Sequence, residues 1–141
     1  MVELGAKVGV KVPLLPFPTY LVGSIQGMGQ RFTIPGYYSD YYIQYNSYVI
    51  GPGLTIYPLP MINLGASLGY AFTSNQTDLP GGMLGSEGGF GMELSGGYEM
   101  KFNHANNLLV GVKYVATATD LEGGIPMNQG GFFVFGRYVR K

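Results

Sequence analysis

The fold of this chain is indicated first by the stretch Val2-Glu3-Leu4-Gly5-Ala6-Lys7-Val8-Gly9-Val10-Lys11-Val12. An aliphatic residue stands at every second position, and glycine or a charged residue stands at each position between. A period of two is typical of a β-strand with one apolar and one polar face. A helix would need apolar residues three and four positions apart and a glycine content far below 24 in 141 residues.

The same alternation returns along the whole chain. Strands are expected at 2–12, 19–30, 41–57, 62–72, 90–101, 108–117 and 129–140. Their connections alternate between short and long, and the long ones are expected at 31–40, 73–88 and 119–128. Within 41–57 the apolar face changes phase around Gly51-Pro52-Gly53. This change predicts a β-bulge, because Pro52 cannot donate to a sheet ladder.

The composition fits one domain spanning 1–141. No segment offers the roughly 20 consecutive apolar residues of a transmembrane helix, and the absence of cysteine excludes disulfides and thiolate sites. Eight Lys and Arg balance eight Asp and Glu, so nucleic acid is not an expected partner. The first residues lack the basic and apolar run of a signal peptide, so an exported chain would be mature, trimmed or a fragment.

The clearest strands place their charges opposite the aliphatic residues. The charges expected to line the interior are Glu3, Lys7, Lys11, Glu93, Glu99, Lys101 and Lys113. Glycines such as Gly65 and Gly69 share that face, and small residues suit the inside of a narrow barrel. The side chains expected to meet lipid are Val8, Val10, Leu64, Leu68, Leu94, Val110 and Val112. Because hydrocarbon offers no partner to an open sheet edge, such a sheet must close.

Three stretches carry a family resemblance. They are Gly51-Pro52-Gly53-Leu54-Thr55-Ile56-Tyr57-Pro58-Leu59-Pro60, Leu64-Gly65-Ala66-Ser67-Leu68-Gly69-Tyr70 and Leu109-Val110-Gly111-Val112-Lys113-Tyr114. The chain resembles the eight-stranded outer-membrane β-barrels of Gram-negative bacteria, the OmpA-like and OmpW-like families. The resemblance implies an all-β, antiparallel, up-and-down transmembrane barrel of about eight strands. It also implies periplasmic short turns and extracellular long loops, and Asn128, Gly130, Phe133 and Phe135 resemble the recognition signal of the insertion machinery.

Seven strands leave the expected barrel one strand short, since single-chain bacterial barrels have an even number of strands. An N-terminal strand that precedes Met1 in a longer protein is the favoured explanation. Alternatively, the region 41–57 splits in two, or a second chain completes the barrel. The expected partners are therefore outer-membrane lipid and a completing strand or protein.

The expected function is structural or adhesin-like, with the interior plugged because nearly balanced charges in a confined space pair with one another. A hairpin rich in tyrosine is the candidate partner surface, at Tyr37, Tyr38, Tyr41, Tyr42, Tyr45 and Tyr48. An aromatic girdle at the membrane interface would use the same residues. The long loops are acidic, which favours a solvated cap.

Other classes remain open at this stage. The inward charges could instead line a small channel or porin, and a soluble lipocalin-like or avidin-like barrel would turn Leu64, Leu68, Val110 and Val112 inward. His104 is the only histidine and shows no nucleophile or acid beside it, so neither catalysis nor a metal site is expected, and no cofactor. A barrel hydrolase is the enzymatic alternative.

Overall fold

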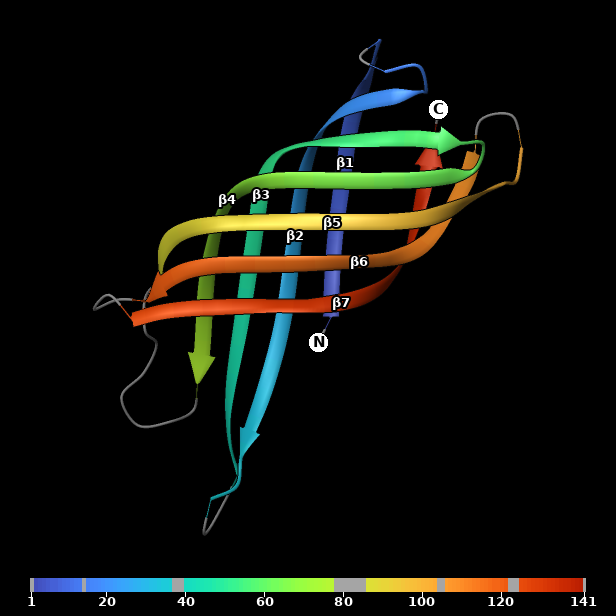
Figure 1. Ribbon diagram of the computed structural model, residues 1–141. Coiled ribbons are helices and arrows are strands. Elements are labelled where there is room, and N and C mark those ends of the chain that lie inside the picture. The colour runs from blue at the N-terminus through green and yellow to red at the C-terminus, as the bar shows by residue number, and fades with distance from the viewer. Residues whose placement is uncertain are drawn as a thin grey trace.

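The computed structural model describes residues 2–13, 15–36, 40–77, 86–103, 106–121 and 125–140. In this part of the chain the protein is all-β, with strands β1 (Val2–Val12), β2 (Thr19–Ile34), β3 (Tyr41–Leu59), β4 (Ile62–Thr77), β5 (Ser86–Lys101), β6 (Asn106–Leu121) and β7 (Ile125–Arg140). Each strand pairs antiparallel with the next, so one sheet follows chain order (Figure 1). The predicted seven-stranded up-and-down arrangement is confirmed.

The strands run further than the hydrophobic alternation does. The β2–β3 ladder continues through Arg31 opposite Gln44 to Ile34 opposite Tyr41, across residues expected in a loop. The loops predicted at 73–88 and 119–128 are likewise partly strand. Backbone N–H and C=O groups pair whatever side chains they carry, so the ends of a ladder leave little trace in the side-chain pattern.

The β-bulge predicted at Gly51-Pro52-Gly53 is wrong in its position. Pro52 lies opposite Gly23 in an unbroken β2–β3 register, and the β3–β4 register shifts only between Ile56 and Leu59. The phase change in the sequence has another cause. Along the face of β3 that turns inward, apolar side chains at one end give way to polar and small residues further on, while the pleat itself continues.

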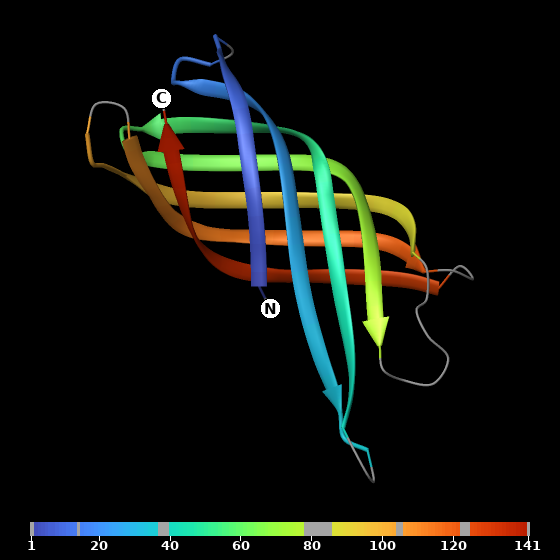
Figure 2. The ribbon, with the colours of Figure 1, turned by 180° about the vertical axis from the view of Figure 1, so that it is seen from behind.

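The sheet is strongly curled (Figures 1 and 2). Inside the curl, side chains from strands distant in the sequence meet. Ser47 of β3 donates to Gln129 of β7, and Lys7 of β1 reaches Glu93 of β5. β1 and β7 are the two edges of the sheet, and no ladder joins them among the described residues. An up-and-down sheet with an odd number of strands leaves these edges running in the same direction. Closure into a barrel is therefore not part of the observed fold.

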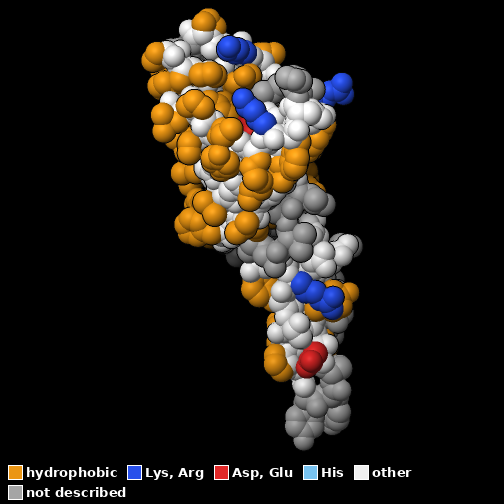
Figure 3. Space-filling model, turned by 90° about the vertical axis from the view of Figure 1, so that its right-hand side faces the viewer, with side chains coloured by type: hydrophobic (Ala, Val, Ile, Leu, Met, Phe, Trp, Pro, Cys, Tyr) orange, Lys and Arg blue, Asp and Glu red, His pale blue; other side chains and the backbone are white. Residues whose placement is uncertain are grey.

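Burial is inverted relative to a water-soluble domain. The interior holds buried polar or charged residues, namely Thr19, Ser24, Gln26, Ser47, Asn63, Ser67, Thr73, Glu93, Glu99, Asn107, Lys113, Thr117 and Thr119. Large hydrophobic side chains instead cover the outside (Figure 3). Soluble proteins rarely expose so extensive an apolar surface, which marks a contact with lipid or protein.

Two neighbouring strands approach closely where glycines face each other. A Cβ at Gly69 of β4 would lie 2.2 Å from the carbonyl oxygen of Ile50, and a Cβ at Gly51 of β3 would lie 2.4 Å from the Cα of Gly69. Only glycine fits at this contact. The glycines expected inside a narrow barrel therefore have a steric role in the tightly curled sheet.

Candidate functional site

The centre of the interior is an ion cluster built on one carboxylate. Glu93 of β5 is 1% exposed. It accepts a hydrogen bond from the Lys7 ammonium of β1 through Oε1, and the Lys113 ammonium of β6 lies 3.9 Å from its Oε2. The cluster connects three strands in a region of low dielectric. There the attraction between opposite charges is strong, and removing one partner leaves an uncompensated buried charge.

A second buried carboxylate lies on the same face of β5, nearer the short turns. Glu99 accepts hydrogen bonds from the Tyr57 hydroxyl at 2.5 Å and from the Asn107 amide. Tyr57 comes from β3 and Asn107 from β6, so this group also spans the interior. Hydrogen bonds to a charged acceptor are the strong ones, and they offset the cost of burying it.

A third group fills the interior toward the long connections. The Ser47 and Thr73 hydroxyls lie 2.9 Å apart, and those of Thr73 and Thr119 lie 3.1 Å apart. Ser47 also donates to Gln129 of β7. Together the three groups place charged and hydrogen-bonded side chains along the interior.

Two cations lie against one aromatic ring on the side of the interior next to β7. The Arg137 guanidinium lies 5.2 Å and the Lys113 ammonium 5.5 Å from the centre of the Phe135 ring. Among the described residues Arg137 forms no ion pair, and Glu93 contacts both Lys7 and Lys113.

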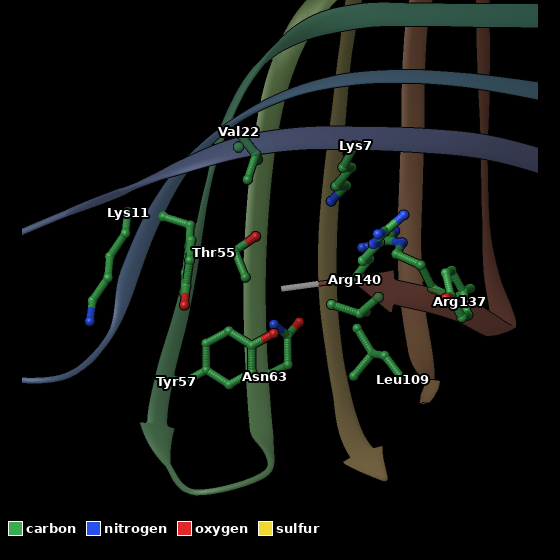
Figure 4. Close-up of a pocket in the computed structure, with 13 residues that line it drawn as sticks. Lys7, Lys11, Val22, Thr55, Tyr57, Asn63, Leu109, Arg137 and Arg140 are labelled. Carbon is green, nitrogen blue, oxygen red and sulfur yellow. The ribbon is translucent and has the colours of Figure 1, made fainter. Parts of the chain in front are cut away.

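A cavity of about 470 Å³ lies inside the curled sheet near the short turns, and its lining comes from β1, β2, β3, β4, β6 and β7 (Figure 4). Its basic lining residues are Lys7 and Lys11 of β1 and Arg137 and Arg140 of β7, and Tyr57 is among its polar ones. The described lining contains no Asp or Glu. The described lining of the cavity is therefore basic and contains no acid.

The predicted interior charges fall into three groups. Glu93, Glu99 and Lys113 are buried, Lys7 is half-buried and joins them, and Lys11 and Lys101 are exposed at strand ends. Lys101 contacts none of the others in the described structure, and the side chain of Glu3 lies outside the described residues.

Arg137, Tyr57 and Asn107 are interior residues that the sequence pattern did not predict. In β7 both faces carry aromatic residues, so the hydrophobic pattern alone does not show whether Arg137 faces inward or outward. Tyr57 was hidden in the segment whose phase was misassigned to a bulge.

The seven side chains predicted to face lipid are all exposed, from 38% for Val110 to 81% for Val8. Leu64 and Leu68, which a soluble ligand-binding barrel would bury, are among them. Their strands bury polar partners instead, such as Asn63 and Ser67. The alternation assigned the two faces of these strands as the structure has them.

The predicted tyrosine surface is partly described. Tyr48 stacks on Phe72 at 5.0 Å between ring centres, and the Arg31 guanidinium lies 4.2 Å from the centre of the Tyr42 ring. Tyr41 and Tyr45 lie on the same strand. Tyr37, Tyr38 and His104 lie outside the described residues.

No group of three or more His, Cys, Asp or Glu residues suited to a metal ion occurs among the described residues. No helix in that part of the chain is long and apolar enough to span a membrane. No protein-family model matches the chain, and no curated protein or solved structure is significantly similar to it.

Proposed function

We propose that this chain is an outer-membrane β-barrel protein with a plugged interior and a structural or surface-recognition role. The observation that carries the proposal is the inverted burial, with Glu93 and Lys113 inside and Val8 and Leu68 outside. In water this arrangement exposes apolar area at a large cost, and in a bilayer it removes that area from water. The resemblance to OmpA-like and OmpW-like barrels agrees with it.

In a bilayer the sheet must close into a barrel. Unpaired backbone groups in hydrocarbon cost several kcal/mol each, so β1 and β7 need partners. Because both edges run in the same direction, one additional antiparallel strand between them gives an all-antiparallel barrel of eight. We propose that such a strand is supplied by a longer form of this chain or by a second chain.

The recognition part of the proposal rests on the β2–β3 hairpin. The pairing of β3 with β4 continues to Ile43 opposite Thr77, whereas that of β4 with β5 ends at Ala71 opposite Gly89. The end of β3 that carries Tyr41 and Tyr42 therefore projects past the neighbouring strands. With the long connections extracellular, this hairpin is presented to the surroundings. Tyrosine provides large contact area at low entropic cost.

Reconstitution tests the proposal. Purified protein should need detergent to stay monodisperse, and in planar bilayers it should show no stable conductance, since the three polar groups fill the interior. A stable conductance would favour the channel, and monodispersity without detergent would favour a soluble barrel. Turnover of phospholipid or lipid A by the protein would reveal an enzyme.

The recognition role needs its own test. Bacteria that display the protein should adhere to a protein-coated surface, and the double variant Y41S/Y42S should adhere less at equal surface expression. Equal adhesion of the variant and the wild type would leave only the structural role.

A further inference from the structure

The two faces of the sheet exchange polarity along the β2–β3 hairpin. In the body of the sheet, the inward face of β3 carries the buried Ser47, and the outward face carries Ile50, which is 49% exposed. Toward the long connection, the inward positions of both strands become apolar and most of the outward positions become polar. The inward residues there are Phe32, Ile34, Tyr41, Ile43 and Tyr45, and the outward residues are Arg31, Thr33, Tyr42, Gln44 and Asn46.

This part of the hairpin extends past its neighbours (Figures 1 and 2). The β1–β2 pairing begins at Val2 opposite Gly29, so it does not reach Phe32. Lipid would meet the outward face of the sheet, and it therefore does not account for apolar residues on the inward one. Phe32 and Ile34 are nevertheless 45% and 42% exposed. Exposed apolar side chains gathered on one face mark a contact with a ligand or partner.

A cavity of about 560 Å³ lies against this inward face. Phe32, Ile34, Ile43 and Tyr45 line it from the hairpin, and Met127 lines it from β7. The rings of Phe32 and Tyr45 meet edge to face, with their centres 6.0 Å apart. The described lining contains no charged residue. A mostly apolar cavity of about 300–1,000 Å³ is typical of a small-molecule site.

The cavity also has a hydrogen-bond donor. Gln129 of β7 lines it, and the side-chain oxygen of Gln129 accepts a hydrogen bond from Ser47. The side-chain nitrogen of Gln129 is buried and has no hydrogen-bond partner among the described residues. A buried donor without a partner is costly, and a ligand that supplies an acceptor removes this cost.

We propose that this cavity binds a small, uncharged and largely apolar molecule that carries an oxygen acceptor. The apolar body packs against Phe32, Ile43 and Met127, and the oxygen accepts a hydrogen bond from the Gln129 amide. Binding such a molecule goes beyond a structural or adhesin-like role. It does not depend on the membrane, because the cavity lies on the inward face of the strands.

The site is also compatible with an eighth strand. Met127 lies opposite Thr119 and Gln129 lies opposite Thr117, and both threonines are buried on the inward face of β6. Met127 and Gln129 therefore reach the cavity from the inner side of the sheet. A strand paired with the free edge of β7 would add to the wall around the cavity and enclose it further.

Photolabelling with benzophenone tests the site, because this neutral ketone has two apolar rings and one oxygen acceptor. Its excited carbonyl oxygen takes the hydrogen of a nearby C–H group, and the two carbon radicals then join. The whole chain is irradiated in lipid vesicles, and mass spectrometry locates the label. Labelling should be saturable and should concentrate on Met127 and on the hairpin. Met100 is the internal control, since it is 40% exposed on the outward face. Equal labelling of Met100 and Met127 would overturn the proposal.

Variants of the hairpin separate the two faces. F32S/I43S should raise the benzophenone concentration for half-maximal labelling of Met127 by about tenfold or more, because apolar contacts are lost. T33S/Q44S changes neighbouring outward positions and is the matched control, which should leave labelling unchanged. F32L/I43L should retain most of the labelling, which shows that loss in F32S/I43S is not misfolding. Equal losses in the serine variants of both faces would contradict the assignment.

Competition tests the hydrogen bond. Fluorenone differs from fluorene by a ketone oxygen, and it should displace benzophenone at a concentration about two- to tenfold lower. In Q129M the two competitors should act alike. Equal competition in the wild-type protein would overturn the role of Gln129 as the donor. Saturable labelling of Met127 in a protein that stays monodisperse without detergent would support the site and contradict the membrane proposal.

Discussion

The wall formed by β3 to β6 and the seam between β1 and β7 differ in whether their strands are paired on both sides. In the wall every strand is paired on both sides, and the buried Glu93 and Glu99 each have donors from other strands. At the seam two edges face each other without a ladder, and Arg137 and Lys11 line a cavity that contains no described acid. The two regions therefore differ in backbone pairing, and the sheet is incomplete only at the seam.

The sharpest test of this contrast removes charge from each region. E93Q takes away the carboxylate between Lys7 and Lys113 and should reduce the free energy of unfolding by about 3–5 kcal/mol, since breaking a buried pair leaves uncompensated charge. R137Q removes a cation that forms no ion pair with a described residue, and it should change the free energy of unfolding by at most about 0.5 kcal/mol. Urea unfolding of protein folded into lipid vesicles measures both.

The control for E93Q is D120N, which removes an exposed carboxylate from β6. It should leave the unfolding free energy nearly unchanged. Equal destabilisation by E93Q and R137Q would show that losing Arg137 at the seam costs as much as losing the buried Glu93 carboxylate in the wall. The contrast between the two regions would then be lost.

The second prediction concerns the outer face of the wall. Leu68 is 54% exposed on β4, so L68K should cost about 2–4 kcal/mol if this position lies near the middle of a bilayer. On a water-facing surface the same change would be nearly neutral. Unfolding of L68K in vesicles, compared with Q76K on an exposed position of β4 near its end, measures the difference. A neutral L68K would remove the membrane assignment.

The sequence predicted most of this wall and little of the seam. In β4 and β5 the side-chain alternation is strict, so it placed Leu68 outside and Glu93 inside correctly. Alternation says nothing about contacts between strands distant in the sequence. The pairing of Tyr57 with Glu99 and the approach of Arg137 to Lys7 depend on how far the sheet curls. In β3 the polarity of the inward face changes along the strand. In the sequence this change looks like a shift of phase, and for that reason the prediction of a β-bulge was wrong.

The third prediction concerns steric fit in the wall. G69A should destabilise the protein by about 1–3 kcal/mol, because its Cβ would overlap the β3 backbone and force the strands apart. On the seam strand β7, a Cβ at Gly136 would meet nothing within 4 Å. G136A is therefore the matched control and should be tolerated. Thermal unfolding followed by the β-sheet circular dichroism signal measures both, and equal loss would argue against tighter packing in the wall.

The smallest expected effect tests whether interior hydrogen bonds hold the seam strand in place. Ser47 of β3 shares a buried contact with Thr73 and donates to Gln129 of β7. S47A should cost about 1 kcal/mol, the net value of a neutral hydrogen bond. Because Gln129 belongs to an edge strand with a ladder on one side only, hydrogen exchange should rise more in β7 than in β4. S95A is the control, since the Ser95 hydroxyl makes only a 3.5 Å contact with the Gly65 carbonyl. An equal rise across both strands would mean that β6 alone positions β7.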